Sequence, residues 1–198
     1  MGLAQPKSLL FTLEEYLEEE RQAFERSEFI DGEIYAMAGE SGRHGDISAN
    51  FLASLVVNLR GTDFRARTKD TRVKSGLIKK QFGKGMISYP DIVVICGEPQ
   101  YHDFHKDVVL NPTVIIEVLS ESTEEFDRGV KFLRYRNFNE TLSDYILVSQ
   151  NEPLIEHYIR QPNNDWLLKE YSGLETTFEI KSINCTVKLK DIYDRIEF

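Results

Sequence analysis

The chain has 198 residues and a formal net charge of −9; 41% of its residues are hydrophobic and 29% are charged. This is the composition of an ordinary globular protein, and it argues against long disordered stretches. No apolar run reaches the ~18 residues that a membrane-spanning helix needs, so no membrane segment is expected. Cys96 and Cys185 do not form a CxxC pair, which favours a reducing, cytoplasmic location and no zinc site. We expect one domain covering residues 1–198.

One segment is strongly basic although the protein is acidic overall. From Arg60 to Lys84 there are nine cations and two anions, a net charge of +7, whereas the other residues carry 15 cations and 31 anions. Such a segment suits a surface that follows the phosphates of a nucleic acid. The alternative is a solvated hairpin whose lysines protect a sheet edge, and the charge taken alone favours this alternative.

The N-terminal third predicts a helix, a hairpin and a longer helix. Thr12-Leu13-Glu14-Glu15 has the pattern of a capping box that opens a helix to about Arg21. Residues 28–37 indicate two strands around an Asp-Gly turn. Ser41 then caps a helix to about Arg60, which Gly61 ends. His44 lies at the N-terminal end of this helix's apolar face, which consists of Ile47, Phe51, Leu55 and Leu59.

The rest of the chain is mainly extended. Strands are expected at 64–68, 71–79, 86–96, 113–120 and 144–149, with a loop at 97–111. Ser122-Thr123-Glu124-Glu125 has the pattern of a second capping box, and its helix runs to about Arg136. The apolar face predicted for that helix is Phe126, Val130 and Leu133. A β-meander over 152–190 completes the chain, with turns at 162–164 and 172–173.

Two carboxylates interrupt apolar strands. Glu117 lies within a β-branched run that is typical of a central strand covered on both faces, and Asp91 directly precedes Ile92-Val93-Val94-Ile95. Burying an ionised, unpaired carboxylate is costly, so each acid needs a proton, a cationic partner or a metal. If the two strands are neighbours, a divalent cation removes the repulsion between the acids, and oxygen ligands suit Mg²⁺ or Mn²⁺. Either acid alone can also be a strand-end charge that reaches solvent.

In this order and spacing, several short motifs resemble the Uma2 family, a domain-of-unknown-function group placed in the PD-(D/E)XK nuclease superfamily. The resemblance extends from about Thr12 to Glu170 and rests on Glu28-Phe29-Ile30-Asp31-Gly32-Glu33, His44, Tyr89-Pro90-Asp91-Ile92-Val93, Ile116-Glu117-Val118-Leu119-Ser120, Ser122-Thr123, Asp127, Lys131 and Tyr135. It implies an α/β (α+β) fold with a restriction-endonuclease-like core, a mixed central β-sheet flanked by helices. An N-terminal helix and hairpin and a C-terminal β-meander are additions to this core.

The resemblance also implies a catalytic centre. Asp91 and Glu117 match the two metal-binding acids of the superfamily, with Mg²⁺ or Mn²⁺ as the cofactor. The lysine that usually follows the second acid by two residues is absent, because Leu119 occupies that place. Lys131 on the next helix is then the expected catalytic cation. The alternative for Lys131 is an i,i+4 ion pair with Asp127 on a solvated helix face.

Four further residues are candidates for supporting roles at this centre: His44, Glu28, Glu33 and Glu40. A histidine at a helix N-terminus is disfavoured in its protonated form, which suits a neutral metal ligand or a donor to a ligand. An ordinary helix-start residue fits His44 equally well. Each glutamate can also simply be exposed to solvent.

The resemblance implies a metal-dependent endodeoxyribonuclease, a hydrolase that cuts DNA phosphodiester bonds. Arg65, Arg67 and Lys74 are expected to contact the DNA backbone without reading its sequence, and a homodimer is expected. One alternative is a nucleic-acid-binding module without catalysis, which Leu119 favours and the two acids oppose. Another is a structural or partner-binding protein that uses the C-terminal meander as an oligomer interface.

Overall fold

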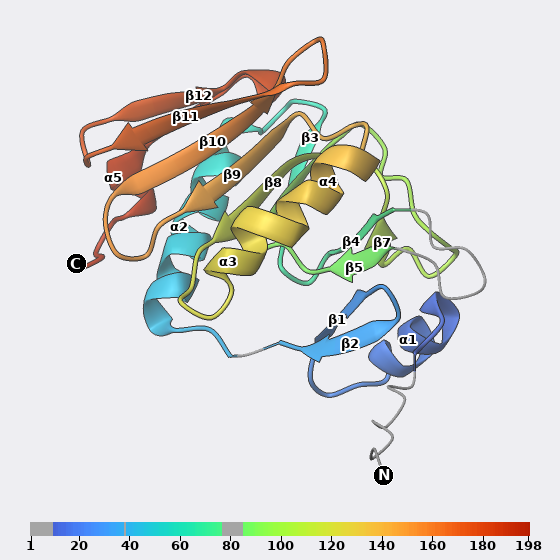
Figure 1. Ribbon diagram of the computed structural model, residues 1–198. Coiled ribbons are helices and arrows are strands. Elements are labelled where there is room, and N and C mark those ends of the chain that lie inside the picture. Colours follow the sequence, from blue (N-terminus) through green and yellow to red (C-terminus); the bar gives the residue numbers. More distant parts are fainter. Residues whose placement is uncertain (1–9, 38, 77–84) are drawn as a thin grey trace.

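The computed structural model describes residues 10–37, 39–76 and 85–198 (Figure 1). The end of the predicted 71–79 strand and three lysines of the basic segment, Lys79, Lys80 and Lys84, lie outside these ranges. The helices are α1 (Leu13–Glu20), α2 (Gly42–Asn58), α3 (Glu124–Phe126), a π-helical turn (Asp127–Lys131), α4 (Phe132–Phe138), a 3-10 turn (Lys181–Ile183) and α5 (Leu189–Ile192). The strands are β1 (Ser27–Ile30), β2 (Glu33–Ala36), β3 (Phe64–Thr68), β4 (Arg72–Ser75), β5 (Met86–Ser88), β6 (Ile92–Cys96), β7 (Val108–Val109), β8 (Pro112–Val118), β9 (Asp144–Val148), β10 (Leu154–Arg160), β11 (Trp166–Ser172), β12 (Thr177–Ile180) and β13 (Cys185–Lys188).

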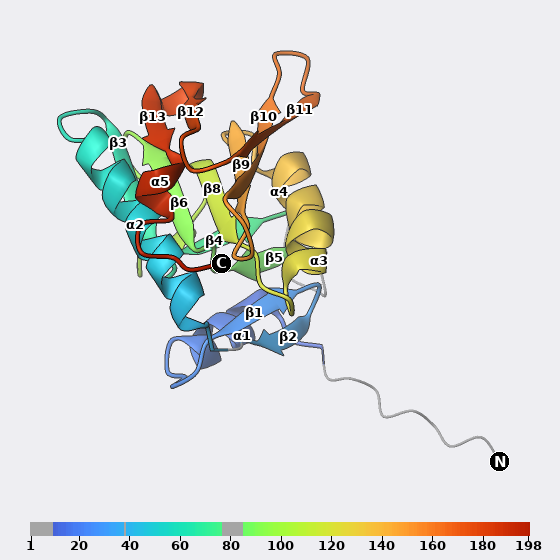
Figure 2. The ribbon, with the colours of Figure 1, turned by 90° about the vertical axis from the view of Figure 1, so that its left-hand side faces the viewer.

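A six-stranded mixed sheet forms the centre of the molecule, in the order β11-β10-β9-β8-β6-β3. The β8–β9 pair is parallel, and the neighbouring β6–β8 and β9–β10 pairs are antiparallel. All seven residues of β8 are buried, which confirms the central strand predicted around Glu117. Figure 2 shows why: α2 lies on one side of this sheet, and α3 and α4 lie on the other.

The alternation of side chains along the strands builds two cores. Ile92, Val94 and Ile116 pack with the buried face of α2, whereas Val93, Ile95 and Ile115 pack with α4. On the α4 side, the rings of Phe132 and Tyr145 stack with centroids 4.9 Å apart. The same alternation points Glu117 toward the α3–α4 side, because it has the parity of Ile115.

A second sheet, β2-β1-β5-β4-β7, carries the N-terminal additions. The continuous strand predicted at 86–96 is wrong: its first part is β5 in this sheet, and its second part is β6 in the central sheet. The break falls at Tyr89-Pro90-Asp91, where proline lacks the N–H needed to continue a ladder. Asp91 therefore lies at the junction between two sheets.

The locally encoded features agree with the sequence. Thr12 and Glu15 form the predicted capping box, and the side chain of Ser41 caps α2 by accepting from the amide of His44. Asp31 and Gly32 both have positive φ, 53° and 98°, as a two-residue hairpin turn requires. The C-terminal meander is also present, although β12 and β13 pair separately from the central sheet. Among the described residues, no helix combines the length and apolarity needed to cross a bilayer.

The predicted apolar face of the helix after β8 is wrong at two of its three residues; Phe126, the third, packs against the core. Val130 and Leu133 are 44% and 45% exposed, whereas Asp127 and Lys131 are buried. The reason is the π-helical turn at 127–131, whose hydrogen bonds link residues five rather than four positions apart, and so rotate the face that meets the sheet. The second capping box is wrong as well, since Thr123 makes no side-chain capping bond. Helix α4 ends at Phe138, two residues later than expected.

Candidate active site

Asp91 and Glu117 are cross-strand neighbours. In the antiparallel β6–β8 ladder Ile92 pairs with Ile116, which places Asp91 beside Glu117. The amide of Asp91 donates to Oε2 of Glu117 at 3.4 Å, and the amide of Val118 donates to Oδ2 of Asp91 at 2.8 Å. The two acids are only 9% and 3% exposed, so neither is a strand-end charge that reaches solvent.

Lys131 points into the same site from the π-helical turn. Its Nζ lies 3.0 Å from Oε1 of Glu117, 3.3 Å from Oδ1 of Asp127 and 3.4 Å from Oε1 of Glu28. The i,i+4 contact between Asp127 and Lys131 therefore exists, but it is buried and shared with two other acids. The ammonium lies at the centre of three carboxylates, two of them distant from it in sequence.

Burial shapes the ionisation of this group. Burial raises the pKa of Glu117 well above its usual range; Lys131 opposes this shift, and the charges of Asp127, Asp91 and Glu28 add to it. Burial by itself would lower the pKa of Lys131, but Glu117, Glu28 and Asp127 outweigh it, so the net shift is upward. Lys131 thus stays protonated, while Glu117 keeps its proton to a higher pH than an exposed glutamate does.

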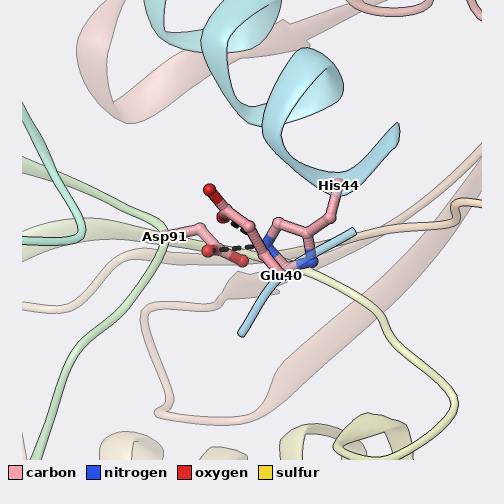
Figure 3. A group of neighbouring side chains, drawn as sticks. All are labelled: Glu40, His44 and Asp91. Atoms are coloured by element: carbon pink, nitrogen blue, oxygen red, sulfur yellow. Dashed lines mark hydrogen bonds and ion pairs between the residues drawn. The ribbon is translucent and has the colours of Figure 1, made fainter. Parts of the chain in front are cut away.

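Asp91 also belongs to a second group of potential ligands, together with Glu40 and His44 (Figure 3). Nε2 of His44, in the first turn of α2, lies 2.8 Å from Oδ1 of Asp91. Oε2 of Glu40 lies 3.9 Å from the same nitrogen, and Lys69 forms an ion pair with Glu40. One ligand atom from each of Glu40, His44 and Asp91 lies within 4.8 Å of the others. Asp91 therefore faces a histidine, whereas Glu117 faces a lysine.

The other predicted supporting residues differ in placement. Glu28 joins the site, because Oε1 accepts from the amide of Tyr89 at 3.1 Å and also contacts Lys131. Glu33 does not: it is exposed on β2 and accepts from the hydroxyl of Tyr35. Within the described residues, Glu33 makes no hydrogen bond or ion pair with the residues around Asp91.

The residues predicted to contact DNA lie on two sheets. Arg65 and Arg67 share one face of β3, the edge strand of the central sheet, where Arg65 pairs with Glu98 at 2.9 Å and Arg67 donates to the hydroxyl of Tyr101 at 2.8 Å. Lys74 belongs to β4 in the second sheet and is partly buried, which lowers its pKa. The structure therefore places the two arginines on one strand and Lys74 on a strand of the other sheet.

Gln150 contacts the site but was missed by the sequence analysis. Its Nε2 lies 2.6 Å from the carbonyl oxygen of Leu119 and 3.3 Å from Nδ1 of His44. Its Oε1 accepts from the hydroxyl of Ser41 at 2.9 Å. The available signal was its position just after β9, which runs parallel to β8 and ends at the same edge of the sheet.

Comparisons with known proteins identify the family of the chain. The model of the Uma2 family, described as "Putative restriction endonuclease", matches residues 13–188. The chain is 35% identical over 170 residues to an uncharacterised protein, sll1609, of Synechocystis sp. (strain ATCC 27184 / PCC 6803 / Kazusa), which covers 86% of this chain and 92% of that protein. It is 34% identical over 185 residues to a second uncharacterised protein of that strain, slr1290, covering 93% of this chain and 92% of the relative.

A solved structure shares the fold. It is the crystal structure of "a putative nuclease belonging to DUF820" from Anabaena variabilis ATCC 29413, which superposes with a TM-score of 0.73 over 94% of this chain and 99% of that chain, at 17% identity. This similarity confirms the predicted mixed sheet flanked by helices, with a nuclease-like fold. With a family model that spans most of its length, the chain belongs to the Uma2 family of restriction-endonuclease-like proteins.

Proposed function

We propose that the chain is a single-domain, metal-dependent endonuclease that hydrolyses DNA phosphodiester bonds and acts as a cytoplasmic homodimer. The observation that carries this proposal is the position of Lys131. Its buried ammonium lies 3.0 Å from Glu117 even though Leu119 occupies the usual lysine place. Two acids and a lysine thus share one buried site where the neighbouring inner strands β6 and β8 meet, which is what an acid-and-cation phosphodiesterase centre needs.

The donor set fits a hard divalent cation. Asp91 and Glu117 offer carboxylate oxygens, and Oε1 of Glu117 is buried and has no hydrogen-bond partner of good geometry among the described residues. Oxygen ligands of this kind suit Mg²⁺ or Mn²⁺. Bound there, such an ion would lower the pKa of a coordinated water and neutralise charge on the phosphate.

The chain's own residues supply the positioning. The amide of Val118 orients the carboxylate of Asp91, and Lys131 is held charged by the surrounding acids. We assign Lys131 the role of orienting the attacking water and stabilising the negative charge that develops on the phosphate. Arg65 and Arg67 on the edge strand β3 would contact the DNA backbone.

Cleavage of supercoiled plasmid tests the proposal. The parent should nick DNA with Mg²⁺ or Mn²⁺ and not with chelator, and Asp91→Asn and Glu117→Gln should each abolish nicking. Glu179→Gln, which changes an exposed acid on β12, is the matched control and should cut at the parent rate. Equal cutting by either site variant, in nuclease-free preparations, would refute the acid pair.

If the parent protein does not cleave DNA under any of these conditions, two alternative functions remain. Salt-dependent DNA binding without cleavage would indicate a catalytically inactive nucleic-acid-binding module on this fold. Neither cleavage nor DNA binding would indicate an oligomeric interaction module.

A further inference from the structure

His44 is held by hydrogen bonds at both ring nitrogens. Nε2 faces Oδ1 of Asp91 at 2.8 Å, and Nδ1 faces Nε2 of Gln150 at 3.3 Å. The side chains of His44 and Asp91 are each only 12% exposed, so little water competes with these contacts. The polarity of the Gln150 contact therefore determines which ring nitrogen carries the proton.

The orientation of the Gln150 amide follows from two other partners. The carbonyl oxygen of Leu119, 2.6 Å away, can only accept, so it must face the NH₂ group of Gln150. The hydroxyl of Ser41 donates to the opposite atom, Oε1, at 2.9 Å. The second hydrogen of the NH₂ group then points at Nδ1 of His44, which must accept it. The proton of the neutral ring consequently lies on Nε2 and is donated to Asp91.

This arrangement is opposite to that of a metal-ligating histidine. Such a residue coordinates with one nitrogen and donates the N–H of the other to a carboxylate or a carbonyl. In this chain the outer nitrogen of His44 accepts from an amide, and the inner nitrogen, which faces Glu40 and Asp91, carries the hydrogen. The compact Glu40–His44–Asp91 group therefore has ligand-type residues, but the histidine is in the wrong tautomer to coordinate a metal.

We infer that Gln150 is a positioning residue that keeps His44 as a hydrogen-bond donor to Asp91, and that it thereby excludes nitrogen from the metal's ligand set. An oxygen-only set favours Mg²⁺ and Mn²⁺, whereas adding imidazole favours Zn²⁺. The metal-selectivity part of this inference rests on the proposed function; the tautomer part does not.

The tautomer is measured directly by long-range ¹H–¹⁵N correlation of the histidine rings, with His44→Gln used to assign the signals of His44. In the metal-free parent, His44 should be protonated at Nε2. In Gln150→Met, which keeps the side-chain length and removes the donor, the ring should populate both tautomers. A parent protonated at Nδ1 would overturn the inference. An unchanged Nε2 tautomer in a folded Gln150→Met would show that Asp91 alone sets the ring, and would also overturn it.

Metal selectivity supplies a second readout. Gln150→Glu replaces the donor with an acceptor, so Nδ1 should be protonated and the lone pair of Nε2 should face Glu40 and Asp91. Calorimetric titration with Zn²⁺ alone should give an affinity increased about tenfold over the parent, a size typical of changes to a ligand's hydrogen-bond partner. Adding His44→Gln to this variant should remove the increase. If His44→Gln in the parent background lowers the Zn²⁺ affinity about tenfold, His44 already coordinates the metal in the parent, and the inference is wrong.

These experiments separate the inference from the proposed function. An Nε2 tautomer that depends on Gln150, in a protein that cuts no DNA, would sustain the inference and refute the nuclease. Metal-dependent nicking by a parent whose His44 is protonated at Nδ1 would support the nuclease and refute the inference about Gln150.

Discussion

The Nζ atom of Lys131 lies 3.0 Å from Oε1 of Glu117, and both side chains are buried. The contact joins the central strand β8 to the π-helical turn, two elements that are connected in sequence by residues 119–126, which include α3. Asp127 and Glu28 surround the same ammonium. Lys131 is therefore a structural cation whatever its catalytic role. Replacing it tests both the stability of the fold and the catalytic activity.

Replacing Lys131 with methionine should destabilise the protein and remove most of its turnover. The change leaves three buried carboxylates without their cation, and removing one partner of a buried ion pair costs about 3 to 5 kcal/mol. Urea unfolding at neutral pH measures the loss, and Lys131→Arg should recover most of it by restoring the charge. Metal binding by folded Lys131→Met should persist, because Asp91 and Glu117 remain. A variant as stable as the parent would show that the carboxylates do not depend on this lysine.

The metal-free protein should become less stable, relative to Glu117→Gln, as the pH rises. Burial raises the folded pKa of Glu117 above its unfolded value, so the native state binds the proton more tightly. The stabilisation that comes from this tighter proton binding by Glu117 is complete below the unfolded pKa of about 4.3. It is lost as the pH rises through the folded pKa. Glutamine cannot ionise, so Glu117→Gln should melt higher than the parent at about pH 8 in chelator, and the difference should shrink toward pH 5.

Added Mg²⁺ should reverse that order. A cation that binds the folded parent stabilises it by mass action, and Glu117→Gln should lose most of this gain. Thermal melts of both proteins at each pH, with chelator and with Mg²⁺, provide the measurement. A Gln variant that is less stable than the parent in chelator at every pH would identify Glu117 as the anion of a structural ion pair with Lys131.

Two glycines with equally open surroundings should respond oppositely to alanine. A methyl group added at Gly129 or at Gly61 meets no neighbouring atom within 4 Å. Gly129 lies in the π-helical turn, so alanine should stabilise the fold by about 0.5 to 1 kcal/mol through helix propensity. Gly61 has φ +76°, where alanine is strained by about 1 kcal/mol. Urea denaturation compares the pair, and destabilisation by Gly129→Ala would mean that the π turn needs the freedom of glycine.

DNA binding should depend more on β3 than on β4. Arg65→Gln and Arg67→Gln should each lower the slope of log K against log[salt] by about 0.9, the change for one lost phosphate contact. Lys74→Gln should change it less, because this ammonium is partly buried. Lys188→Gln, an exposed change on β13, is the control for overall charge. If Lys188→Gln changes the salt slope as much as Arg65→Gln does, the DNA does not bind along β3.

The sequence by itself determined the features that depend on near neighbours. The Thr12–Glu15 capping box, the Asp31–Gly32 turn and the Ser41 cap each involve groups within a few residues, so their chemistry can be read directly. The apolar run around Glu117 similarly determined a central strand, because only burial on both faces suits it. For the pairing of Asp91 with Glu117 the sequence supplied only a connection long enough to allow it, and the β6–β8 ladder shows that the two strands are neighbours.

The tertiary structure decided what depends on partners distant in sequence. A 3.6-residue period predicted Val130 and Leu133 as buried, but the burial of Lys131 among Glu28, Glu117 and Asp127 accompanies a π turn that shifts the buried face. No local pattern encodes that shift, because its gain in free energy comes from carboxylates on other elements. The role of Gln150 is of the same kind. Its amide has one polarity only because Leu119, Ser41 and His44 converge on it from three separate parts of the chain.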